Sequence, residues 1–227
     1  MAKYGQFCPV AKAAEILGER WMLLVVRELV CGSRRYGELQ RGLGRISPGV
    51  LSQRLKTLVD AGVIRRVSDA APACYELTEA GRELEPVIMA VGTWGQRWSR
   101  SRLTRGELDV ELLVLELARN LDTEALGLDP AVLALCFTDL HGEARRWWLR
   151  VERAHVDICR SHPGRPHDVQ LTGTLRALTE VWRGDLSPFE AIRAGSLVVD
   201  DPARVVKRIE RWLGVSRLAH VAAAASL

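Results

Sequence analysis

The sequence predicts an α+β protein with two domains, a mainly helical one followed by a mixed one. Its 227 residues exceed one typical domain, and 48% hydrophobic with 26% charged residues is typical of a globular chain. Apolar residues recur at helical spacing over the first hundred residues, whereas apolar and polar residues alternate in several later segments. We therefore place the domains at 1–102 and 107–227, with a polar, basic connector over 99–106.

The first domain shows a regular order of predicted elements. Helices are expected at 9–17, 21–31, 36–42 and 47–61, strands at 63–66 and 75–77, and a long helix from 78 to 98. Segment 46–66 is the most informative. Ser47 suits a helix N-cap, and Pro48 suits the first helical position. The stripe of Leu51, Leu55 and Leu58 predicts that one side of this helix faces a core.

The other side of that helix is polar. Ser52, Gln53 and Lys56 fall there, and a strand ending in Arg65 and Arg66 follows directly. This is the layout of a winged helix-turn-helix unit that reads DNA; the alternative is an ordinary amphipathic helix followed by a strand. Residues 1–100 carry 15 Lys and Arg against 10 Asp and Glu, so the positive charge lies in the half that holds the motif.

The candidate DNA contacts fall into two chemical classes. Side-chain cations are expected on phosphates and give salt-dependent affinity; they are Arg34, Arg35, Arg54, Lys56, Arg65 and Arg66. Small or amide residues near the helix start are expected on base edges; they are Ser47, Gly49, Ser52 and Gln53. Gln53 is the strongest candidate because an amide can pair bidentately with adenine. For each arginine alone, a solvated surface charge is the alternative.

An apolar stripe on the long helix after residue 78 needs a partner surface. Its members share spacings of three and four; they are Leu84, Val87, Ile88, Val91, Trp94 and Trp98. The stripe could pack on its own domain, but aromatic residues at its far end favour a homodimer seam. A twofold protein also suits double-stranded DNA with a near-palindromic operator.

The second domain begins with period-two segments at 134–140, 146–152, 155–159 and 168–173, which predict a meander of strands. Helices are expected at 174–183, 187–194 and 202–214, and a short strand at 196–199. Aromatic residues here either line a ligand cavity or fill the core; they are Phe137, Trp147, Trp148, Trp182 and Phe189. Adjacent tryptophans on a strand point to opposite faces, so at most one of Trp147 and Trp148 faces that interior.

Several classes of protein are disfavoured. Five scattered cysteines without a C-x-x-C pair argue against a disulfide framework, and no familiar metal-ligand spacing or cofactor motif is present. No nucleophile elbow or phosphate loop is found, so we expect no enzymatic activity. No apolar run reaches the ~20 residues of a membrane helix, and the first residues lack the core of a secretory signal. We therefore expect a cytoplasmic protein.

Short motifs in residues 7–98 resemble the HxlR family, a branch of the MarR-like winged helix-turn-helix regulators of bacteria. They include Leu17-Gly18-Glu19-Arg20-Trp21, Arg35-Tyr36-Gly37-Glu38-Leu39, Leu51-Ser52-Gln53-Arg54-Leu55 and Tyr75-Glu76-Leu77-Thr78. The resemblance implies a dimeric transcriptional regulator. The chain departs from the family in the wing, where 70–74 is uncharged although a basic residue is common there. Arg65 and Arg66 would then have to make the wing contact.

Cys8 is a candidate redox sensor. It directly precedes Pro9 at a helix start, where the helix dipole favours the reactive thiolate. The family resemblance supports the idea, because some members sense oxidants or electrophiles through a cysteine at this N-terminal position. The alternative is a small buried residue at the helix end.

A second resemblance covers roughly 107–214. The segments 178–185, 188–189, 191–192 and 194–197 are similar to the helical part of a sterol-carrier-protein-like domain. That resemblance implies an apolar tunnel for a hydrophobic ligand. Together the two halves predict a DNA-binding transcriptional regulator that responds to a small hydrophobic effector. The alternative is a carrier of lipids or hydrophobic metabolites whose helical domain is a protein-interaction module without DNA contact.

Overall fold

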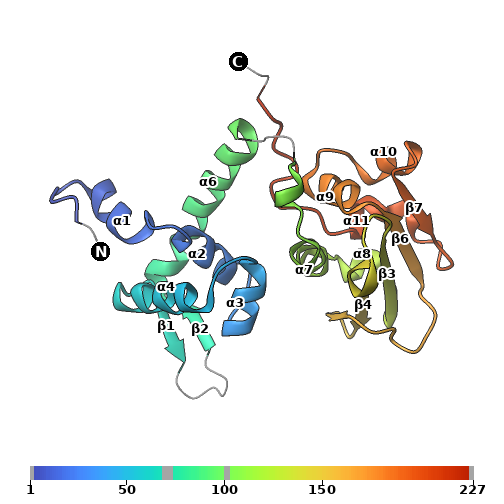
Figure 1. Cartoon of the computed structure of the whole chain (residues 1–227), viewed down its shortest axis with the longest axis horizontal. Helices are drawn as coiled ribbons and strands as arrows, with labels where there is room; N and C mark the ends of the chain where they lie inside the picture. Colours follow the sequence, from blue (N-terminus) through green and yellow to red (C-terminus); the bar gives the residue numbers. More distant parts are fainter. Residues whose placement is uncertain (1–2, 68–73, 100–102, 225–227) are drawn as a thin grey trace. The chain divides into compact units, whose positions relative to one another are not determined.

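The computed structural model (Figure 1) describes residues 3–67, 74–99 and 103–224. The chain divides into two compact units, 1–95 and 96–227. Part of the expected connector and the expected hairpin tip at 68–72 lie outside the described residues. No described helix is both long enough and apolar enough to cross a membrane.

The N-terminal unit consists of helices followed by a β-hairpin and two further helices. Its elements are α1 (Pro9–Leu17), α2 (Met22–Val30), α3 (Tyr36–Gly42), α4 (Pro48–Asp60), β1 (Ile64–Val67), β2 (Cys74–Leu77), α5 (Glu79–Arg82) and α6 (Glu85–Trp98). β1 and β2 pair antiparallel, with Arg65 opposite Glu76. Arg35 forms an isolated bridge to Cys74, so the turn before α3 adds a third short segment beside β2.

The core of this unit forms between α2, α3 and α4. The leucine stripe of α4 is buried as the sequence predicts, with Leu51, Leu55 and Leu58 at most 1% exposed. These side chains pack with Met22 and Val25 of α2 in one hydrophobic cluster. Burial of three leucines contributes about 5–9 kcal/mol of transfer free energy, which fixes the face that α4 turns inward.

The prediction of a single long helix from residue 78 to residue 98 is wrong. Thr78 caps α5 by accepting a hydrogen bond from the Gly81 N–H, but α5 ends at Arg82 and α6 begins only at Glu85. Pro86 explains the break because it has no N–H to donate to the preceding turn, and its ring clashes there.

A buried carboxylate ties α2 to α3. Glu28 is fully buried; its carboxylate accepts hydrogen bonds from Arg27 Nη2 at 2.5 Å and Ser33 Oγ at 3.1 Å. Arg27 Nη2 also donates to the carbonyl of Gly42 at 3.0 Å. A Cβ at position 42 would come within 1.8 Å of the Glu28 carboxylate, so glycine is required where α3 ends.

The C-terminal unit contains a five-stranded sheet covered by helices. Its elements are α7 (Val110–Asn120), α8 (Thr123–Leu126), β3 (Ala131–Phe137), β4 (Arg146–Glu152), β5 (His155–Cys159), β6 (Val169–Gly173), α9 (Leu175–Arg183), α10 (Pro188–Arg193), β7 (Leu197–Asp200) and α11 (Ile209–Trp212), with short 3₁₀ turns at 105–107, 142–145 and 206–208. The strand order is β5-β4-β3-β6-β7.

The predicted meander is confirmed for β3, β4 and β5, in which each strand pairs antiparallel with the next. The prediction is wrong for β6, the fourth strand of the sequence expectation. β6 lies on the other side of β3 and runs parallel to it. All seven residues of β3 are buried, which is typical of a central strand with a neighbour on each side. β6 supplies the second neighbour.

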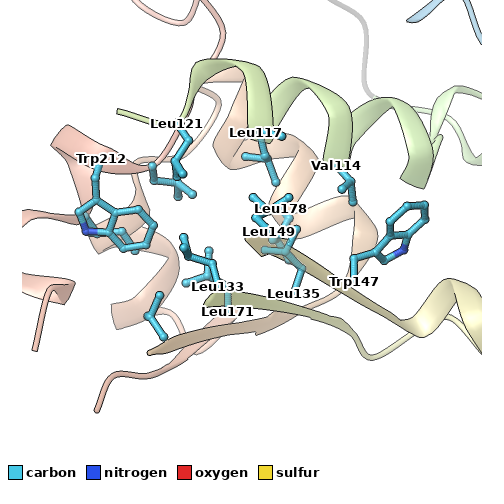
Figure 2. Packing of buried hydrophobic residues seen from close by; sticks show 14 of the residues in the cluster. Val114, Leu117, Leu121, Leu133, Leu135, Trp147, Leu149, Leu171, Leu178 and Trp212 are labelled. Atoms are coloured by element: carbon cyan, nitrogen blue, oxygen red, sulfur yellow. The ribbon is translucent and has the colours of Figure 1, made fainter. Parts of the chain in front are cut away.

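The core of this unit lies on one face of the sheet. Figure 2 shows Val114 and Leu117 of α7 pointing toward Leu135 and Leu149 of the strands, and all four belong to one buried cluster. Trp212 closes the same cluster and donates from its indole N–H to the carbonyl of Val205 at 2.9 Å.

Three helices of this unit differ from the sequence expectation, and one of them, the short α8, has no counterpart among the expected elements. Helix α7, whose N-cap Asp109 accepts from the Leu112 N–H at 3.1 Å, was not predicted. The last helix is much shorter than the expected 202–214. Asp201 accepts from the N–H groups of Val205 and Val206, both at 2.8 Å, so this segment forms a side-chain-stabilised turn in place of helix.

Replacing Glu28 by alanine should lower the free energy of unfolding of the N-terminal unit by about 3–5 kcal/mol, because the Arg27 guanidinium and the Ser33 hydroxyl lose a buried partner. Urea denaturation followed by circular dichroism measures this. The exposed Glu79→Ala serves as the matched control and should change stability by less than about 0.5 kcal/mol. A Glu28→Ala cost below about 1 kcal/mol would contradict the structural role.

Candidate nucleic-acid interface

The outward face of α4 presents polar groups to solvent. Ser47 caps the helix by accepting from the Val50 N–H at 3.4 Å, and Gly49, Gln53 and Lys56 follow at spacings of four and three. All are exposed, and Gln53 has no hydrogen-bond partner among the described residues. Nothing lies within 4 Å of a Cβ added at Gly49, so the backbone is open at the helix start. Unpaired amide and backbone groups on an exposed helix end can reach base edges and phosphates.

Tyr36 holds the first turn of α4 in place. Its hydroxyl donates to the carbonyl of Pro48 at 2.8 Å and accepts from Ser52 Oγ at 3.5 Å. Ser52 is exposed, but part of its hydrogen-bonding capacity is directed at Tyr36. Sequence reasoning did not select Tyr36; the only available signal was a hydroxyl-bearing aromatic at the start of the preceding helix.

The turn before α3 is fixed by Glu38, whose carboxylate accepts from the N–H groups of Arg34 at 2.9 Å and Arg35 at 3.0 Å. Desolvation acts to raise the pKa of Glu38, but these backbone hydrogen bonds and the nearby arginines outweigh it and lower the pKa below its usual value. The result is an anchored turn that carries two cations, both exposed.

Contrary to the sequence prediction, the side chain of Arg54 is not exposed for a phosphate contact but binds within its own unit. Its guanidinium forms an ion pair with Glu19 and donates from Nε to the carbonyl of Arg20 at 2.9 Å, and only 19% of its side chain is exposed. These contacts join α4 to the turn between α1 and α2, where Trp21 adopts a left-handed conformation with φ of 80°. Arg54 therefore positions α4 against that turn, and its guanidinium is not free for a phosphate.

The two wing arginines differ in their surroundings. Arg65 pairs with Glu76 at 2.8 Å, and Arg34 pairs with the same carboxylate at 3.0 Å. The hydrogen bond from Arg65, followed by the charges of both arginines, lowers the pKa of Glu76. Arg66 is exposed and has no described ion-pair partner. Since neighbouring strand residues point to opposite faces, Arg65 and Arg66 cannot approach the same phosphate side by side.

One exposed cation near α4 was missed by the sequence reasoning. Arg45 lies in the turn after Gly44, two residues before the Ser47 cap. It has no described ion-pair partner. Lys56 is exposed and sits 3.7 Å from Asp60, a weak helical pair. Among the described residues, the exposed cations of this surface without an ion pair are thus Arg35, Arg45 and Arg66, whereas Lys56 makes only the weak pair with Asp60.

The apolar stripe of α6 divides into two groups. Leu84 and Ile88 pack against the core of their own unit. The other four remain exposed, with Val87 at 44%, Val91 at 49%, Trp94 at 63% and Trp98 at 54%. The spacing of four, three and four places these four on one side of the helix.

The candidate ligand-binding aromatics are spread over two faces of the C-terminal sheet. Phe137 and Trp147 are buried in the core at 0% and 4% exposure, and Trp182 and Phe189 pack partly buried against it. Trp148 points to the opposite face, as strand alternation requires. Cys8 precedes α1 as its N-cap and is half-buried, with no side-chain capping hydrogen bond. Redox sensing by Cys8 stays a prediction.

Replacing Arg54 by alanine should lower the free energy of unfolding by about 1–3 kcal/mol, because Glu19 and the Arg20 carbonyl lose a charged donor. Urea denaturation of the full chain measures the change, with Arg45→Ala as the matched exposed control. Unchanged stability in Arg54→Ala would contradict a structural role for the contacts of Arg54 with Glu19 and the Arg20 carbonyl.

Known proteins resemble the N-terminal part of the chain. Residues 16–102 match the HxlR-like helix-turn-helix family. Rv3095 of Mycobacterium tuberculosis, an uncharacterized HTH-type transcriptional regulator, is 46% identical over 92 residues, which are 39% of this chain and 58% of that protein. This chain therefore spans little more than half the length of the mycobacterial relative.

This chain covers a larger share of two proteins from Bacillus subtilis. The uncharacterized HTH-type transcriptional regulator YvaP is 37% identical over 99 residues, which are 41% of this chain and 90% of YvaP. The reduced form of the transcriptional regulator YodB is a solved structure with 32% identity and a TM-score of 0.35, covering 40% of this chain and 93% of YodB. The family match and the near-complete coverage of YvaP establish that this chain belongs to the HxlR-like helix-turn-helix family.

Proposed function

We propose that this protein is a sequence-specific, DNA-binding transcriptional regulator that acts as a homodimer and responds to a small hydrophobic effector. The observation that carries the proposal is the division of α4 into two faces. Its leucines are buried at no more than 1% exposure, whereas Gly49, Gln53 and Lys56 are exposed on the other side. A helix held in this way can enter a major groove without losing its packing.

The charge around α4 supports binding to a polyanion. Arg35, Arg45 and Lys56 are exposed cations close in sequence to the two ends of α4 or to the turn that precedes α3. Arg34 and Arg65 share the Glu76 carboxylate, so a phosphate must compete with it for either of them. We therefore assign most of the non-specific affinity to the first group and to Arg66.

The alternative function, a carrier whose helical unit docks another protein, finds less support. A protein-docking helix needs apolar anchors on its exposed face. The exposed positions of α4 up to Lys56 are proline, glycine, serine, glutamine and lysine, and its one exposed large apolar side chain, Val59 at 37%, lies near the C-terminal end of the helix. We likewise propose no enzymatic activity for the chain.

The dimer seam is proposed for the exposed stripe of α6, formed by Val87, Val91, Trp94 and Trp98. Leu84 and Ile88 are left out of it, because they already pack on their own unit. Two tryptophans and two valines on one side of a helix form an apolar patch of the kind that marks protein interfaces. A twofold dimer would present two copies of α4 to successive major grooves of a near-palindromic operator.

We infer that the C-terminal unit is a sterol-carrier-protein-like effector domain. A five-stranded sheet with helices α7, α9 and α11 on one face supports this inference. The effector must bind one conformation of the dimer more tightly than another, because equal affinity for both would shift nothing.

Replacing Gln53 by alanine should weaken binding to the preferred DNA sequence about tenfold or more, because the base-edge contact is lost. Binding to random DNA should change little. The preferred sequence is selected from a random library with the wild-type chain, and affinities are measured by fluorescence anisotropy over a range of salt concentrations. Lys56→Ala should weaken binding to both the preferred and the random DNA. It should also reduce the slope of log affinity against log salt concentration by about one unit, because one phosphate contact is lost.

The matched control for these measurements is Arg193→Ala, an exposed arginine of α10 in the C-terminal unit, which should bind both DNAs as the wild type does. Wild-type affinity and specificity in both Gln53→Ala and Lys56→Ala would overturn the proposed reading surface.

Replacing Trp94 by aspartate should convert a dimer into a monomer at micromolar concentration, because a charge would be buried in an apolar seam. Sedimentation velocity measures the change in mass. Arg97→Asp on the same helix introduces an acidic residue outside the stripe and should leave the mass unchanged. A wild-type chain that is monomeric, or a Trp94→Asp variant that remains dimeric, would refute this seam.

A further inference from the structure

The face of the C-terminal sheet opposite the helices carries a second set of side chains. Ala134 of β3 pairs with Trp148 of β4 and with Gln170 of β6, so the three side chains lie together on that face. Their immediate neighbours Leu135, Trp147 and Leu171 point to the helix-covered core. The second face is therefore built from an aromatic ring, a methyl group and an amide.

The chain between β5 and β6 crosses this face. β5 ends at Cys159 beyond β4, whereas β6 begins at Val169 beyond β3, so residues 160–168 must pass over both central strands. The His162 ring stands edge-on to Trp148, with ring centres 5.6 Å apart and planes at 73°. Asp168 anchors the end of the segment by accepting from Val132 N–H at 2.8 Å and Arg165 Nη2 at 2.6 Å.

A cavity of about 210 Å³ lies between this crossing segment and the sheet. Residues from both walls line it, among them Ala134, Arg146, Trp148, His162, His167 and Gln170. Drug-sized ligands occupy sites of about 300–1,000 Å³, so this cavity suits a smaller molecule with a single ring.

The polar groups of the cavity are mostly hydrogen-bond donors. The Gly164 N–H donates to Nδ1 of His162 at 3.1 Å, so neutral His162 carries its proton on Nε2 and offers a donor there. Arg146 is exposed, and its guanidinium has no acceptor among the described residues. No aspartate or glutamate lines the cavity in the described part of the chain, and Asp200 nearby is held by His167 at 3.0 Å.

We propose that this cavity binds a small aromatic carboxylate, with the anion held by Arg146 and His162 and the ring placed against Trp148 and Ala134. A guanidinium recognises a carboxylate through two parallel hydrogen bonds, which favours this anion over a neutral amide. The indole face and the alanine methyl favour a planar apolar ring over acetate or inorganic phosphate. The site stands independently of DNA binding; its role as the effector site rests on the proposed function.

Isothermal titration of the full chain with benzoate tests the site. Benzoate should bind with one site per chain and a dissociation constant below about 1 mM. Benzamide, acetate and inorganic phosphate should each bind at least tenfold more weakly. Arg146→Ala should weaken benzoate at least tenfold, and Trp148→Leu should do the same, whereas the adjacent exposed Arg145→Ala should bind as the wild type does.

Circular dichroism and the melting temperature of each variant establish that it is folded. Equal binding of benzoate by wild type, Arg146→Ala and Trp148→Leu would overturn the proposal, as would equal affinity for benzamide or phosphate. The effector role is read separately, as a change in DNA affinity when benzoate is added. Benzoate binding that leaves DNA affinity unchanged would support the site and contradict its effector role. Neither result changes the separate test of DNA recognition, which is the weaker binding of Gln53→Ala to the preferred sequence.

Discussion

The orientation of α4 is the constraint on which the proposed function depends. Three leucines hold one side of the helix in the core, while Tyr36 fixes its first turn and Arg54 ties its middle to the turn between α1 and α2. Contacts from three directions leave the helix little freedom to rotate. The residues that remain exposed are therefore determined by packing, and Gln53 faces outward because Leu51, Leu55 and Leu58 face inward.

Much of the N-terminal unit could be predicted from the sequence because its signals are local. A serine cap, a proline at the first helical position and leucines at helical spacing specify α4 without knowledge of the rest of the chain. The role of Arg54 could not be predicted, because its partners Glu19 and Arg20 lie more than thirty residues away. An exposed-looking arginine on a polar helix face gives no sequence signal for such a distant partner.

In the C-terminal unit, local sequence signals likewise predict the strands but not their order in the sheet. Alternation identified β4 and β5 with the correct bounds and placed Trp147 and Trp148 on opposite faces. It could not show that β6 would pair parallel with β3, since period-two patterning carries no information about which strand is the neighbour. That crossing has a chemical consequence: it brings His162 over Trp148 and creates the cavity on the second face.

In the proposed complex, the outward face of α4 lies in the major groove of DNA. The most direct measurement places a photo-reactive amino acid at position 53 and maps its crosslinks on the selected DNA sequence. We expect crosslinks to bases at two places about ten base pairs apart, one for each protomer of a dimer. If the labelled chain still binds DNA but position 53 forms no crosslink to any base, α4 does not lie in the groove and the proposed mode of binding is wrong.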